Sequence, residues 1–108
     1  MKSLRLLLPT CVFFMTAPAI AADLKAAAGL TGMVAGMASE CGLNAAPVYA
    51  EMKSLMDRTN ASQAERRSLG DAATAAAGLG ASTQRKARSC SHVQGELDRA
   101  VATLRRAQ

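Results

Sequence analysis

The sequence predicts an all-α protein: a small three- to four-helix bundle of up-down topology, stapled by the disulfide Cys41–Cys90. No segment alternates apolar and polar residues as a strand would, and aromatic residues make up only 3% of the 108-residue chain. Ala, Leu, Met, Arg, Lys, Glu and Gln dominate instead, which favours helices. Apolar residues recur at spacings of three and four in several segments, as on the buried faces of packed helices.

The first residues have the three parts of a secretory signal peptide. Lys2 and Arg5 supply the positive start, residues 6–15 are uncharged and largely apolar, and Ala19-Ile20-Ala21 is an A-x-A cleavage site. The apolar stretch is too short to span a bilayer. We therefore expect residues 1–22 to be removed and residues 23–108 to form a single helical domain in the periplasm or outside the cell.

A lipoprotein leader is the alternative interpretation, with residues 8–11 as the lipobox and Cys11 as the modified residue. Pro9 and Thr10 fit that motif poorly, and cleavage there would divide the apolar core of the leader. We expect Cys11 to leave with the leader. Removing Lys2 and Arg5 then leaves 11 basic against 8 acidic residues, and Tyr49 is the sole remaining aromatic residue.

Two cysteines remain in the mature chain, Cys41 and Cys90. An even pair in an oxidising compartment predicts a disulfide, and only one connectivity exists. The bridge would close a loop of about 50 residues, which the chain-entropy model values at up to about 4 kcal/mol. In a domain with so thin a core, that is a large share of the total stability.

The first two expected helices cover residues 23–40 and 44–58. Gly42 is suited to the position just after the first helix, and Gly29, Gly32 and Gly36 offer a face on which a neighbouring backbone can approach closely. The second helix carries an apolar stripe that we expect to face the core rather than form a binding groove: Val48, Met52, Leu55 and Met56.

The last two expected helices are separated at Gly78 and Gly80. Ser62-Gln63-Ala64-Glu65 is a capping box that starts the third helix, which should fade near these glycines. Ser82 should cap the fourth, from about residue 83 to 106, with Cys90 on its apolar side. In an up-down bundle this placement brings Cys90 to the end of the first helix, beside Cys41.

No residue pattern predicts catalysis, a metal or a cofactor. Cys90 and His92 are close in sequence, but residues two apart on a helix point to nearly opposite faces. The single histidine and the absence of C-x-x-C or H-x-x-x-H spacing do not supply a zinc site. We expect no enzymatic activity and no bound cofactor.

Basic residues concentrate toward the end of the chain, where residues 82–108 carry six Lys or Arg against two acids. An exported chain without aromatics to stack on bases is a poor candidate for nucleic-acid binding. An acidic protein surface is the expected partner, and anionic lipid headgroups are a less favoured one. A solvated outer face that keeps the protein soluble, without a partner, is the more favoured interpretation of the same charge pattern. The predicted binding face consists of Arg85, Arg88, His92, Arg99 and Arg106.

A signal peptide followed by a small helical domain with two distant cysteines resembles two periplasmic families in layout. These are the HdeA-type acid-stress chaperones and the helical immunity proteins that neutralise cell-wall-degrading toxins. No functional residue carries over from either. The main expectation is a non-enzymatic inhibitor, immunity or adaptor protein that binds another protein. The alternative is a stress chaperone that holds partly unfolded clients.

Overall fold

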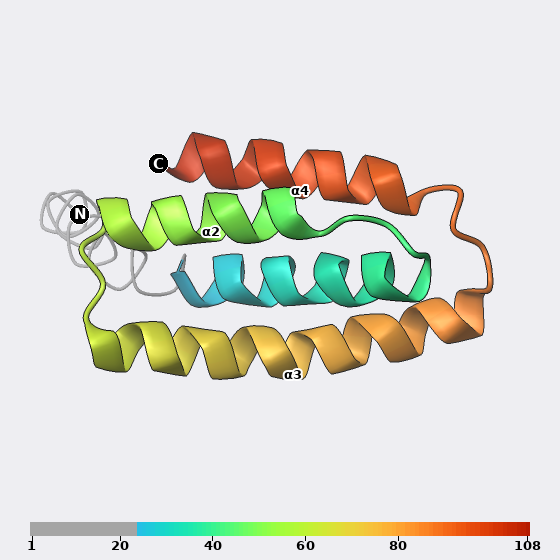
Figure 1. Ribbon diagram of the computed structural model, residues 1–108, viewed down its shortest axis with the longest axis horizontal. Coiled ribbons are helices and arrows are strands. Elements are labelled where there is room, and N and C mark those ends of the chain that lie inside the picture. Colours follow the sequence, from blue (N-terminus) through green and yellow to red (C-terminus); the bar gives the residue numbers. More distant parts are fainter. Residues whose placement is uncertain (1–23) are drawn as a thin grey trace, which may run out of the picture.

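The computed structural model describes residues 24–108, and these form an all-α, up-down bundle (Figure 1). The first helix covers residues 24–40. It is followed by α2 (Ala46–Arg58), α3 (Gln63–Ala87) and α4 (Val93–Ala107). Consecutive helices run in opposite directions, so the first helix lies parallel to α3, and α2 lies parallel to α4. The expected helical bundle and its Cys41–Cys90 disulfide are confirmed. The expected signal peptide, with Cys11, lies outside the described residues.

Local sequence sets several helix ends as expected. Gly42 has a φ of +67° after the first helix. The Leu43 N–H donates to the Ala38 carbonyl over 2.8 Å, closing a Schellman motif that satisfies the carbonyls of the last turn. At the start of α3, the backbone N–H of Glu65 donates to Ser62 Oγ, and the backbone N–H of Ser62 donates to Glu65 Oε1. The predicted capping box is therefore present.

The core is supplied unequally by the four helices. The first helix, α2 and α4 provide nearly all of the buried apolar side chains, whereas α3 provides only Leu69 among the described residues. α2 and α4 also pack directly on each other. The buried apolar residues are Leu24, Ala27, Ala28, Val34, Ala35, Ala38, Val48, Met52, Leu55, Leu69, Val93, Leu97, Ala100 and Leu104.

α3 is held against the first helix through close backbone contact. A Cβ added to Gly32 would lie 2.8 Å from the carbonyl carbon of Ala73, and one added to Gly36 would lie 2.8 Å from that of Ala77. In the opposite direction, a Cβ on Gly80 would lie 2.9 Å from the carbonyl carbon of Met33. Real side chains do not approach this closely, so glycine is required on both helices. The expected close approach is therefore confirmed for Gly32 and Gly36. It is wrong for Gly29, where an added Cβ would meet nothing within 4 Å.

The expected boundary between the third and fourth helices is wrong. α3 continues through Gly78 and Gly80 to Ala87, because Gly80 serves the contact with Met33 instead of ending the helix. Ser82 is consequently inside α3 and caps nothing. The chain breaks later, at residues 88–92, where Arg88 takes the left-handed conformation with a φ of +62°. None of the described helices is long and apolar enough to cross a membrane.

Replacing Gly36 with alanine should destabilise the protein by about 1–3 kcal/mol, because the added methyl group would push α3 away from the first helix. Gly78→Ala is the matched control, since a Cβ at Gly78 meets nothing within 4 Å. That control should stabilise the protein by about 0.5–1 kcal/mol through helix propensity. Chemical denaturation of both variants checks this, and equal stability of the two would contradict the close contact.

Two carboxylates make stability depend on pH. Side-chain hydrogen bonds from Arg105 and then Gln108 lower the pKa of Glu51 below 4.5, and the capping box with Ser62 lowers the pKa of Glu65 in the same direction. A folded-state pKa below the unfolded value means that the stabilisation is present above about pH 4.5 and is lost as the pH falls through the folded value.

Glu51→Gln and Glu65→Gln should therefore each lower the melting temperature at pH 7, by a small amount because Glu65 is exposed and Glu51 is only partly buried. Each difference from the original protein should shrink as the pH is lowered to 3. Thermal unfolding followed by circular dichroism across pH measures it. A difference that grows on acidification would show that these carboxylates are not stabilised by their partners.

Candidate functional site

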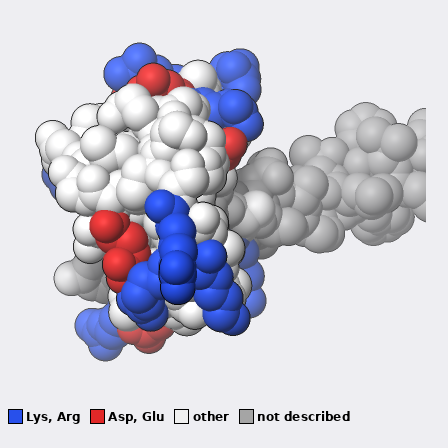
Figure 2. Space-filling view, turned by 90° about the vertical axis from the view of Figure 1, so that its right-hand side faces the viewer, with Lys and Arg blue, Asp and Glu red and all other residues white. Residues whose placement is uncertain are grey.

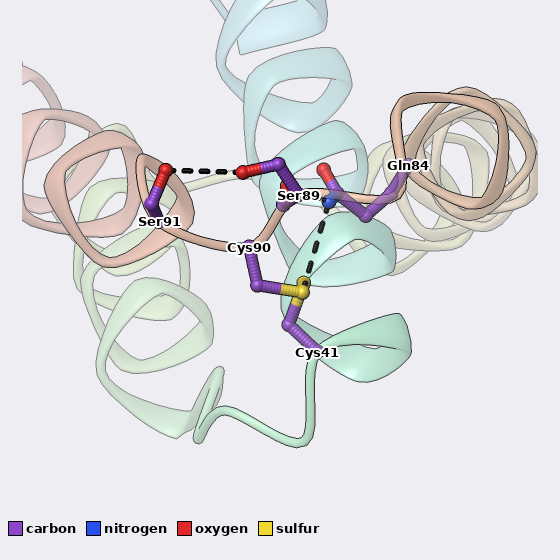
Figure 3. The surroundings of a disulfide bond; sticks show 5 residues. All are labelled: Cys41, Gln84, Ser89, Cys90 and Ser91. Carbon is purple, nitrogen blue, oxygen red and sulfur yellow. Dashed lines mark hydrogen bonds between the residues drawn. A yellow bond between two sulfur atoms is a disulfide. The ribbon is translucent and has the colours of Figure 1, made fainter.

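The disulfide joins the end of the first helix to the loop before α4. Cys41 lies in the turn after the first helix, where its backbone N–H donates to the carbonyls of Met37 and Ala38. The S–S distance to Cys90 is 2.04 Å, and the two Cα atoms are 5.8 Å apart. Figure 3 shows the bridge reaching from the last turn of the first helix to the α3–α4 loop. The loop is thereby fixed to a helix from which it is distant in sequence.

A buried glutamine at the end of α3 supports the same loop. Gln84 is 3% exposed, and its Nε2 donates to the backbone carbonyl of Ser89 and to Cys90 Sγ (Figure 3). Ser89 Oγ and Ser91 Oγ lie 3.1 Å apart. Gln84 Oε1 is buried without a hydrogen-bond partner among the described atoms. The loop is thus held from α3 as well as from the first helix.

Three basic side chains gather beside this loop, and we call them the basic end: Arg85, Lys86 and Arg88. Arg85 and Lys86 lie in the last turn of α3 and Arg88 is its C-cap, so cations sit where the helix dipole is negative. Figure 2 looks onto this end of the molecule and shows Lys and Arg side chains gathered over the lower part, at the level of α3. Arg85 Nη1 pairs with Glu40 of the first helix.

The five residues of the predicted binding face are not brought together. Arg85 and Arg88 belong to the basic end, and His92 is the N-cap of α4 on the far side of the loop. Arg99 pairs with Glu96 on α4 at 3.0 Å, and Arg106 Nη2 donates to the Thr103 hydroxyl. The predicted binding face assumed one continuous helix. The break at residues 88–92 divides its residues between the end of α3 and α4.

The placement of Cys90 on the apolar side of a helix is wrong. Cys90 lies in an exposed loop, although it pairs with Cys41 as expected. The expectation that Cys90 and His92 point to opposite faces of one helix therefore does not apply. The pairing itself occupies the thiol, and a disulfide sulfur is not a free nucleophile. No group of three or more His, Cys, Asp and Glu side chains that could hold a metal occurs in residues 24–108.

Two residues of this end were not predicted to belong to a site. Lys86, which lies one turn before Cys90 on the expected fourth helix, was not among the predicted binding residues. Gln84 carries no motif, and its role depends on α3 extending past Gly80. Gln84 lies six positions before Cys90, and contact between them can be inferred only once the end of α3 is known.

Comparisons with known proteins do not extend this description: no family model, no curated protein and no solved structure matches the chain.

Replacing both cysteines with serine should lower the free energy of unfolding by about 2–4 kcal/mol, because the unfolded chain regains the freedom of a loop of about 50 residues. Denaturation of the Cys41→Ser/Cys90→Ser variant against the oxidised protein measures the change. Mass spectrometry without reduction should identify the Cys41–Cys90 peptide pair. Alkylation of both thiols in the native, unreduced protein would contradict the bridge.

Proposed function

We propose that this chain is an exported, non-enzymatic interaction protein that binds an acidic surface of another protein through the basic end. The class is that of an inhibitor, immunity or adaptor protein. The observation that carries the proposal is the concentration of Arg85, Lys86 and Arg88 at the end of α3, beside a loop that is fixed by the disulfide and by Gln84. A charged surface that is already ordered loses little conformational entropy on binding.

The charges of the basic end are available to a partner. Lys86 and Arg88 are exposed, and neither has a carboxylate partner within residues 24–108. Arg85 is held in place by Glu40. By contrast, the arginines of α4 are largely engaged by acids of their own or of a neighbouring helix, as in the pair of Arg105 with Glu51. Unpaired surface cations steer association with an acidic partner and raise the on-rate.

Export to the periplasm or outside the cell is part of the proposal. It is supported by the leader pattern of residues 1–22 and by the disulfide, which is compatible with an oxidising compartment. In such a compartment the bridge persists, and the basic end stays in the arrangement described above.

Charge reversal tests the basic end. The variant Lys86→Glu/Arg88→Glu should weaken capture of a stoichiometric partner from periplasmic extract by about tenfold or more, since two favourable charge contacts become repulsive. Lys53→Glu/Arg67→Glu is the matched control, because it makes the same change in net charge at exposed positions without ion pairs in the described structure. Equal loss in both variants, or capture that is insensitive to salt, would refute binding through this surface.

A stress chaperone is the second candidate, and the sparse contribution of α3 to the core favours it. Because Leu69 is the only buried apolar side chain of α3 in the described structure, release of this helix would uncover the core of the other three while removing few large apolar side chains from it. Suppression of client aggregation as the pH is lowered distinguishes this function. A protein that remains folded and inert in acid would exclude it.

A further inference from the structure

A cleft lies between α2 and α3, on a part of the molecule that the proposed function does not use. Its volume is about 280 Å³. The two helices do not pack directly along their length, and the first helix closes the bottom of the space with Ala28 and Thr31. We call it the α2–α3 cleft. Its walls are formed mainly by Tyr49, Met52 and Met56 of α2 and by Arg66 and Leu69 of α3.

Both threonine hydroxyls of the cleft are hydrogen-bonded within their own helices. The hydroxyl of Thr31 at the bottom donates to the Ala27 carbonyl over 2.7 Å, and that of Thr74 on the wall donates to the Gly70 carbonyl over 2.9 Å. Met52 and Met56 are flexible and polarisable, so they adapt to the shape of an apolar guest. For scale, a cavity of about 150 Å³ lined by apolar side chains is large enough to bind benzene. The chemistry of the interior fits a hydrocarbon.

A cation marks one end of the cleft. Arg66 and Met56 lie next to the short turn between α2 and α3, whereas Tyr49 lies about two helical turns away. The Arg66 side chain is fixed in place, since Nη2 pairs with Asp57 at 2.8 Å and Nε donates to the Ala61 carbonyl at 3.0 Å. No hydrogen bond occupies Nη1 in the described structure. A carboxylate could therefore join Asp57 on the same guanidinium.

We propose that the α2–α3 cleft binds an anionic single-chain amphiphile, such as a fatty acid, with its carboxylate at Arg66 and its alkyl chain along Met56, Leu69 and Met52 toward Tyr49. The apolar interior supplies the affinity by removing methylene groups from water. The guanidinium at one end selects a negative head and fixes the direction of the chain. From residue 49 to residue 56 a helix rises about 10 Å, which suits a medium-length chain.

The test uses decanoate as the probe and Tyr49 as the reporter. Tyr49 is the only tyrosine in a chain without tryptophan, and it lines the cleft, so its emission should change as decanoate binds. Titration of the oxidised protein should give a saturable change with one site per chain. Decyltrimethylammonium, with the same tail and a positive head, should bind about fivefold or more weakly because it meets Arg66.

Gly70 allows the cleft to be filled by design. It lines the cleft, and a Cβ there meets nothing within 4 Å, so Gly70→Leu adds apolar volume at the cleft without a clash at Cβ. Decanoate affinity should fall about tenfold or more in this variant. Gly78→Leu is the matched control: Gly78 is equally unobstructed, lies on the same helix and is outside the cleft lining. It should retain the original affinity.

The contact between Arg66 and the carboxylate head group is tested with a substitution and a matched control. Arg66→Gln should weaken decanoate about fivefold while leaving the neutral probe decanol unchanged, and Arg67→Gln, which removes the neighbouring charge, should have no effect. Absence of saturable decanoate binding to the original protein, or equal loss in Gly70→Leu and Gly78→Leu, would overturn the site. Equal binding of decanoate and decyltrimethylammonium would overturn the assignment of an anionic ligand.

Discussion

The close backbone contact between the first helix and α3 determines the rest of the structure. α3 places a single buried apolar side chain in the core of the described residues, so burial alone does little to fix its position. Gly32 and Gly36 on one helix and Gly80 on the other allow the two backbones to touch. Many weak dispersion contacts along such a seam replace the large side chains that α3 lacks. The seam therefore sets both where α3 lies and how far it stands from α2.

Both proposed sites follow from that position. At one end, α3 delivers Gln84 and the basic end to the loop that the disulfide ties to the first helix. Along its side, α3 stands away from α2 and leaves an apolar cleft above the first helix, with Arg66 at one end. The two sites lie on different parts of the same helix and use different chemistry, namely exposed charge in one and apolar burial in the other. A substitution that abolishes binding at the basic end is therefore expected to leave binding in the α2–α3 cleft intact, and the reverse.

Much of the fold could be predicted from local sequence. The pairing of Cys41 with Cys90 followed from the cysteine count, and the ends of two helices followed from Gly42 and from the Ser62–Glu65 capping box. Gly80 could not be interpreted in this way. Its local preference is to end a helix, but contact with Met33 makes it a packing residue inside one, and tertiary contact overrides propensity. That single error moved the next helix boundary.

The site was predicted less well than the fold for the same reason. Arg85 and Arg88 were identified as candidates, but Arg99 and Arg106 were joined to them on a helix that breaks at residues 88–92. Gln84 and the α2–α3 cleft depend on how helices sit relative to one another, which residue spacing within one helix does not encode. Met56 illustrates this, since its place on an apolar stripe was evident while the open space beside it was not.

The contact between the first helix and α3 can be measured directly by nuclear magnetic resonance of the oxidised protein. A Cβ added to Gly32 would lie 2.9 Å from the Cα of Ala73, and one added to Gly80 would lie 3.1 Å from the Cα of Met33, so an α-proton of each glycine faces the backbone of the other helix. Strong nuclear Overhauser effects between the α-protons of each pair are the predicted result. Their absence, with α-helical chemical shifts retained for both helices, would show that α3 does not rest on the first helix and would contradict the account.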